Sequence, residues 1–200
     1  MTLFFFETAY ANGNPFWNPL TSKTDFRYYC KINGFSKIDY LITLLSWNGA
    51  ASDGGYGKIN SIKRHTDYAK EFFRIFHKDY PDAKIKMLGL NIPSINGGTG
   101  ENYGANHSYS DWYNLVLFVM GLNLSYQELA NEDEFKTYVE FINISAQVDS
   151  EKNMASQEKN VNTRNNNKEM IGINGVHPDM PGYMQIADAV FRALVPEVTE

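Results

Sequence analysis

The chain has 200 residues, enough for one domain with a full hydrophobic core. Hydrophobic residues make up 43% of it and charged residues 20%, the usual balance of a soluble globular protein. The net charge of -5 argues against a nucleic-acid backbone as the main partner. No apolar run reaches the roughly 18 residues that a membrane span needs, and none has the form of a secretion signal, so the compartment stays open.

Cysteine, histidine and glycine usage excludes several kinds of site. Cys30 is the sole cysteine, which rules out an intrachain disulfide and indicates a buried structural thiol. The four histidines show no paired ligand spacing, and no phosphate-binding or dinucleotide glycine motif follows a strand. We therefore expect no metal and no cofactor. The aromatic content is high, with 13 Tyr, 13 Phe and 3 Trp, and exposed members of this set could stack on sugar rings.

The hydrophobic pattern predicts alternating strands and helices. In chain order the predicted elements are a strand at 2–6, an irregular loop at 11–22, a short helix at 25–32, a strand at 39–46, an amphipathic helix at 58–79, a strand at 84–90, a Gly- and Asn-rich loop at 91–108, a helix at 111–131, a strand at 138–144, a polar loop at 145–173 and a final helix. The predicted apolar face of the final helix consists of Ile186, Ala187, Val190, Phe191 and Leu194. His65 and His77 lie on the helix at 58–79, where we expect solvated or half-buried rings.

Strands joined by crossovers of this length pair in parallel. The expected fold is a single α/β domain over residues 1–200, a three-layer α/β/α sandwich with a flavodoxin-like sheet. In such sheets a ligand site lies at the carboxyl ends of the strands. Asn48, the loop at 91–108 and the loop at 145–177 each follow a predicted strand, so we expect them to meet at one edge.

The most informative motif lies near the C-terminus. Residues 174–178 read Asn-Gly-Val-His-Pro, and a Gly-Tyr pair at 182–183 and the final helix follow. Pro181 suits the first helical turn, where a missing N–H costs little. A loop that runs into a packed helix is a rigid mount for a catalytic side chain, which makes His177 a candidate base.

This motif closely resembles the last block of the SGNH (GDSL-like) hydrolases of bacterial type, which reads Asp-x-x-His-Pro followed by Gly-Tyr and an Ile-Ala-Asp helix. A second family block, Gly-x-Asn-Asp after a buried strand, has a partial match in Ser-Trp-Asn-Gly at 46–49. Pro93-Ser94, Gly97-Gly98 and the segment 102–104 are also similar to bacterial members. The resemblance extends from about residue 14 to residue 194.

The resemblance implies an ester hydrolysis site. In the family a serine attacks the ester carbonyl, and the histidine takes the serine proton and passes it to the leaving group. Carried over, His177 is the general base, Asn48 is an oxyanion-hole donor, and Asn174 stands where the family has aspartate. Trp47, Ser94 and His107 are the candidate substrate-binding residues.

The family nucleophile has no counterpart, because no Gly-Asp-Ser occurs near the N-terminus. Ser46, Ser52, Ser94 and Ser145 come at or soon after predicted strand ends, but none follows the strand that should carry the nucleophile. One interpretation is an esterase that lacks its first strand and nucleophile block, acting on a small-molecule or glycan acyl ester, with carbohydrate deacetylation as one such reaction. The other is an inactive member that serves as a carbohydrate- or ligand-binding module. The oligomeric state is not predicted.

Overall fold

A computed structural model describes residues 15–45, 59–94, 109–164, 166–172 and 175–198. The chain divides into two units. The first contains residues up to Leu90 together with Gly121–Phe141, and the second contains Asn91–Met120 and the segment from Ile142 onward.

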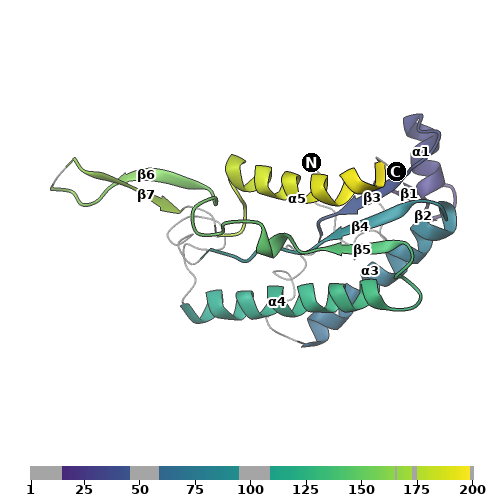
Figure 1. Cartoon of the computed structure of the whole chain (residues 1–200), viewed down its shortest axis with the longest axis horizontal. Coiled ribbons are helices and arrows are strands. Elements are labelled where there is room, and N and C mark those ends of the chain that lie inside the picture. The colour runs from purple at the N-terminus through teal and green to yellow at the C-terminus, as the bar shows by residue number, and fades with distance from the viewer. Residues whose placement is uncertain (1–14, 46–58, 95–108, 165, 173–174, 199–200) are drawn as a thin grey trace. The chain divides into compact units, whose positions relative to one another are not determined.

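The secondary structure follows the predicted alternation along most of the described chain (Figure 1). In order, the elements are β1 (Trp17–Asn18), β2 (Lys23–Thr24), α1 (Phe26–Asn33), β3 (Tyr40–Thr43), α3 (Ile59–Asp79), β4 (Lys84–Leu88), α4 (Tyr109–Asn131), β5 (Val139–Ile142), the short 3-10 helix η2 (Ile144–Ala146), β6 (Ser156–Asn160), β7 (Lys168–Gly172) and α5 (Met180–Val198).

The first unit is built on a three-stranded parallel sheet in the order β3–β4–β5 (Figure 1). β3 pairs with β4 from Tyr40 opposite Lys84 to Thr43 opposite Met87. The N–H of Ile85 then donates to the carbonyl of Tyr138, which joins β4 to the segment that leads into β5. The predicted parallel pairing of the strands at 39–46 and 84–90 is therefore confirmed, with shorter strands than expected.

α3 and the second half of α4 pack side by side within this unit. α3 buries Ala69, Phe72, Phe73 and Phe76, each at most 1% exposed. Thr66 Oγ1 and Ser125 Oγ, one on each helix, lie 2.8 Å apart. Gly121 allows the close approach, because a Cβ there would lie 2.7 Å from Ile62 Cδ1. The apolar spacing that predicted a helix at 58–79 thus marks the face that builds the core.

Asn123 of α4 closes the end of β4. Its Oδ1 accepts the N–H of Leu90 at 2.7 Å, and its Nδ2 donates to the carbonyl of Leu90 at 2.8 Å. Leu90 is fully buried and Asn123 is 8% exposed. Both backbone groups of Leu90 are therefore satisfied after the strand ends, so the chain can leave the sheet inside the protein.

Three side chains in this unit bear on the sequence predictions. Cys30 is buried and free, as expected for a structural thiol. His65 is only 1% exposed, so the expectation of a solvated or half-buried ring is wrong for it. It points inward on α3 because it belongs to the same helical face as Ala69 and Phe72. His77 is half-buried and stacks on Tyr138 with the ring centroids 3.7 Å apart.

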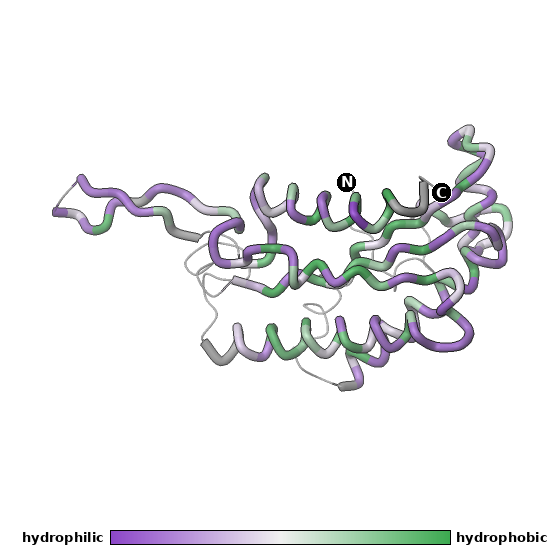
Figure 2. Tube along the Cα trace, viewed as in Figure 1, coloured by the Kyte–Doolittle hydropathy of each residue, from purple (hydrophilic) through white to green (hydrophobic). Residues whose placement is uncertain are grey.

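In the second unit, the predicted polar loop at 145–173 is partly wrong. The segment contains η2 and an antiparallel hairpin in which β6 pairs with β7 from Ser156 opposite Gly172 to Asn160 opposite Lys168 (Figure 1). Most of this hairpin is hydrophilic (Figure 2). Its strands therefore lack the apolar alternation by which strands are recognised in a sequence.

α5 is present where the final helix was predicted, but its buried face is rotated from the predicted one. Ile186 and Ala189 are 8% and 7% exposed, whereas Phe191 is 64% exposed and Ala187 is also exposed. Apolar residues occur all round this helix, so their spacing alone does not select the buried stripe. The predicted strand at 2–6 lies outside the described residues.

Candidate functional site around His177

The His177 segment has an anchored backbone and an outward side chain. Val176 and Pro178 are buried, whereas His177 between them is exposed. The carbonyl of His177 accepts the N–H of Ala155 at 3.3 Å, and Pro178 forms an isolated antiparallel bridge with Met154. The chain bends at 175–177, and the side chain of His177 is exposed although both of its neighbours are buried.

The loop after β4 is joined to the same segment. The N–H of Ser94 donates to the carbonyl of Gly175 at 2.7 Å. Nδ2 of Asn91, a residue that is 3% exposed, donates to the carbonyl of Val176 at 3.2 Å. A second side chain holds the loop, because Nε1 of Trp112 donates to the carbonyl of Pro93 at 3.0 Å. Residues 91–94 therefore form a scaffold for the two residues that precede His177.

The start of α5 explains why the motif continues past the histidine. Asp179 caps the helix, because its Oδ1 accepts the N–H of Gly182 at 3.2 Å. Pro181 lies in the first turn, as predicted. A Cβ on Gly182 would lie 2.4 Å from the carbonyl oxygen of Asn153 and 2.6 Å from Cβ of Pro178. Only glycine lets the helix approach the 153–155 segment this closely.

The 147–155 segment is itself tied to α5. Oε1 of Gln185 accepts the N–H of Asp149 at 2.9 Å, and the N–H of Asp179 donates to the carbonyl of Asn153 at 3.0 Å. Oδ1 of Asp149 in turn accepts the N–H groups of Glu151 and Lys152, each at 3.1 Å. The backbone that presents His177 is thus supported from the loop at 91–94, the 153–155 segment and α5.

Of the residues predicted from the sequence, Ser94 and His177 fall among the described ones, and the hydrogen bond from Ser94 to Gly175 brings their loops together. Trp47, Asn48, His107 and Asn174 lie outside the described residues, as do Ser46 and Ser52. Ser145 lies in η2, where its N–H and Oγ both donate to Oδ1 of Asn143.

The sequence interpretation missed three residues that build this site. Asp179 precedes a predicted helix and has the side chain of a typical N-cap, so a signal was present. Gly182 belongs to the Gly-Tyr pair. Glycine is needed there because of the close approach to Asn153, which no local sequence pattern reveals. Asn91 was included only as part of a Gly- and Asn-rich loop, and its partner is 85 residues away.

Two further findings concern the described part of the chain. Within it, no group of three His, Cys, Asp or Glu side chains gathers where a metal ion would bind. None of the helices described there is both long and apolar enough to cross a membrane.

Comparisons with known proteins bear on the fold. No protein-family model matches the sequence, and no curated protein does. Among solved structures, the chain is similar to a protein from Parabacteroides merdae described as a candidate GDSL-like lipase, with a TM-score of 0.51 and 17% sequence identity. The match covers 84% of this chain and 66% of that one. At this identity the likeness shows a GDSL-like α/β fold.

Proposed function

We propose that the chain is a serine esterase of the SGNH (GDSL-like) type, with His177 as general base. The observation that carries the proposal is the way His177 is held. Its carbonyl accepts a hydrogen bond from the N–H of Ala155, its neighbours Val176 and Pro178 are buried, and its own side chain is exposed. A base must reach the proton it removes without losing its orientation, and an anchored backbone under an exposed ring meets both needs.

The other roles follow from the family resemblance. The proposal includes the family's three-layer sandwich with a flavodoxin-like sheet. Asn48 donates its amide to the oxyanion, a task that suits an uncharged donor because it does not titrate. Asn174 orients the imidazole through its side-chain oxygen. Trp47, Ser94 and His107 contact the substrate.

The reaction has two steps. A serine hydroxyl attacks the ester carbonyl while His177 accepts its proton, and the imidazolium then protonates the departing alkoxide. Water hydrolyses the acyl-serine with His177 again as base, which releases the acid and restores the serine. No serine in residues 1–200 occupies a Gly-Asp-Ser motif, so the nucleophile is not assigned to a residue of this sequence. The substrate class that we favour is an acylated carbohydrate.

The second candidate is an inactive relative that binds a carbohydrate without cleaving it, and Asn174 favours it. Where a serine hydrolase has aspartate beside its histidine, replacement by asparagine lowers turnover by about 10⁴-fold. A chain that binds but does not hydrolyse would tolerate this exchange.

The test measures release of p-nitrophenol from p-nitrophenyl acetate, together with labelling of the protein by a fluorophosphonate. If the esterase proposal holds, His177→Ala lowers the turnover by about 10³-fold or more, and Asn174→Asp raises it. Met184→Ala, a change on an exposed side chain of α5, is the matched control and leaves the rate unchanged.

Three outcomes separate the candidates. Equal turnover with and without His177 would show that the base is wrongly assigned. An unlabelled protein without turnover that binds a neutral glycan, and whose binding is weakened by His177→Ala, would favour the second candidate. A rate that does not respond to Asn174→Asp would argue that residue 174 does not orient the histidine.

A further inference from the structure

A groove of about 940 Å³ lies within the first unit, along β1, β2, α1 and the C-terminal part of α3. Its walls contain the aromatic side chains of Trp17 and Tyr28. They also contain the lysines Lys23, Lys31 and Lys78. None of these residues takes part in the proposed ester hydrolysis, so the groove calls for a separate explanation.

Packing and a hydrogen bond anchor the residues on either side of Trp17. Phe16 packs on Phe26, with ring centroids 4.6 Å apart, and on Tyr29 at 4.9 Å. On the other side of Trp17, Nδ2 of Asn18 donates to Oδ2 of Asp25 at 2.8 Å. Trp17 therefore stands between two anchored residues with its side chain only half-buried, which is the placement of a preorganised contact surface.

Tyr28 is oriented by the same frame. Oδ1 of Asp25 accepts the N–H of Tyr28 at 2.8 Å and caps α1, so one carboxylate positions both the β1–β2 segment and the helix. The Tyr28 side chain is half-buried and makes no ring contact or hydrogen bond with another described residue. Two aromatic rings thus line the groove with part of their surface open to solvent.

The acidic side chains of the groove already have protein partners. Both oxygens of Asp25 accept hydrogen bonds, as described above. Oδ1 of Asp79 lies 3.4 Å from Nε of Arg27, and Oε2 of Glu71 lies 3.6 Å from Nη1 of Arg74. Arg27 balances the charge of Asp79, whereas Asp25 accepts hydrogen bonds only from uncharged groups, and Glu71 shares Arg74 with Glu134.

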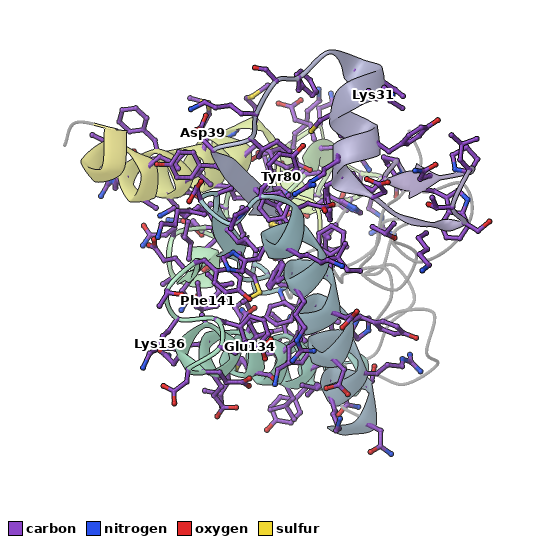
Figure 3. All side chains as sticks on the ribbon, turned by 90° about the vertical axis from the view of Figure 1, so that its right-hand side faces the viewer. Lys31, Asp39, Tyr80, Glu134, Lys136 and Phe141 are labelled. Atoms are coloured by element: carbon purple, nitrogen blue, oxygen red, sulfur yellow. The ribbon has the colours of Figure 1, made fainter. Side chains whose placement is uncertain are left out.

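The three lysines differ from the acidic groups. Among the residues that the structure describes, Lys23, Lys31 and Lys78 have no ion-pair partner. Lys31 projects from α1 (Figure 3). Although the whole chain carries a net charge of -5, four cationic side chains line this groove against three carboxylates, a local excess of one positive charge. Local charge of the opposite sign to the whole marks a site for an anionic ligand.

We propose that the groove binds an acidic glycan, a chain of sugar rings that carry carboxylates. Trp17 and Tyr28 supply aromatic faces for the apolar faces of the rings, and the lysines pair with the carboxylates. A uronate chain has one charge per sugar, which suits lysines that are spaced along the groove rather than packed together. A nucleic acid has a phosphate every 3.4 Å along each strand and needs a denser basic track.

Binding is measured by calorimetry and by the change in tryptophan fluorescence, with oligogalacturonate as probe. Its methyl-esterified form is the matched probe, because it keeps the sugar rings and removes the charge. We expect oligogalacturonate to bind, the esterified form to bind at least about tenfold more weakly, and the affinity to fall as salt rises. A single-stranded DNA of equal charge is the competing polyanion and should bind more weakly.

Variants test the assignment of residues. Lys23→Gln combined with Lys31→Gln should weaken oligogalacturonate binding about tenfold, because two exposed charge pairs are lost. Trp17→Ala should weaken it by a similar factor, and Trp17→Phe should restore part of the loss. Lys136→Gln, which removes an exposed lysine that pairs with Asp133, is the matched control. Thermal melts of each variant confirm that it is folded.

The outcomes that overturn the proposal are distinct from those that overturn the esterase. A folded chain that fails to bind oligogalacturonate, or whose folded lysine variants bind it undiminished, refutes the groove assignment. Equal or tighter binding of the DNA would identify a general polyanion site instead. His177→Ala should leave glycan binding unchanged, so loss of esterase activity and loss of this binding are separable.

Discussion

The side chain of Asn91 donates a hydrogen bond of 3.2 Å to the carbonyl of Val176, the residue before His177. Asn91 follows Leu90 beyond the end of β4, and its side chain thus supports the backbone next to the candidate base. Since Asn91 is 3% exposed and Val176 is 6% exposed, water cannot easily replace this bond. Within the second unit, this buried bond joins the loop after β4 to the C-terminal motif.

Asn91→Ala should lower the free energy of unfolding by about 1–3 kcal/mol, because it leaves the buried carbonyl of Val176 without this donor. If the proposed esterase is correct, turnover should fall as well, since the His177 backbone loses a support. Urea denaturation and the ester assay measure the two effects. Asn131→Ala is the control, because Asn131 makes a similar bond of 2.8 Å to the carbonyl of Gln127 but is exposed. Equal losses for both variants would contradict the role given to burial.

Gly182→Ala should destabilise the protein by roughly 2–3 kcal/mol, because the added Cβ would overlap the carbonyl oxygen of Asn153 and Cβ of Pro178. Gly34, which ends α1 with a φ of 73°, is the contrast, since a Cβ there meets nothing within 4 Å. Gly34→Ala should cost about 1 kcal/mol from backbone conformation alone, and Gly34→Asn less. Asparagine should not rescue position 182. Urea unfolding distinguishes steric overlap at position 182 from backbone strain at position 34. If asparagine were less destabilising than alanine by the same amount at both positions, the steric explanation would be refuted.

The pair of Arg74 and Glu134 should give a pH-dependent contribution to stability. Nε and Nη2 of Arg74 donate to the two carboxylate oxygens of Glu134 at 2.6 and 2.8 Å, and this hydrogen bonding lowers the pKa of Glu134. Because the folded-state pKa lies below the unfolded value, the stabilisation is present above the unfolded pKa. It is lost as the pH falls through the folded pKa.

Glu134→Gln should therefore reduce the free energy of unfolding by about 0.5–1 kcal/mol at neutral pH, the modest size expected for a half-exposed pair. The difference from the parent should shrink as the pH is lowered below about 4. Thermal melts across this range measure it. The neighbouring variant Asp133→Asn removes a carboxylate that is 96% exposed and should have almost no effect. A difference for Glu134→Gln that persists undiminished at low pH would exclude the ion pair as its source.

The helices were the most predictable part of the fold, because their signals are local. The apolar spacing at 58–79 predicted an amphipathic helix, and Ala69, Phe72 and Phe76 lie on the face that this helix buries. The hairpin of β6 and β7 could not be predicted in this way. Its strands are polar, and what stabilises them includes their mutual pairing and a cross-strand ion pair between Glu158 and Lys168. Such pairing leaves no apolar period in the sequence.

The candidate site was likewise predictable only where its signal is local in the sequence. The motif around His177 singled out the residue, and the resemblance predicted a role as general base, which stays a prediction. It did not indicate that Asn91, Ser94 and Ala155 hold the backbone around it. Nor could composition reveal the groove, because its charge depends on which carboxylates find partners. Asp79 is neutralised by Arg27, a residue 52 positions away in the chain.

By itself the sequence determined the alternation of helices and parallel strands, the position of the candidate base and the likeness to the GDSL-like fold. Each of these features follows from residue spacing or from a short motif, and both depend only on neighbours along the chain. The tertiary structure alone decided the buried face of α5, the need for glycine at Gly182 and the hydrogen bond from Asn91 to Val176. These depend on which distant backbone and side-chain groups meet when the chain is folded, and that is set by packing and hydrogen-bond satisfaction across the molecule.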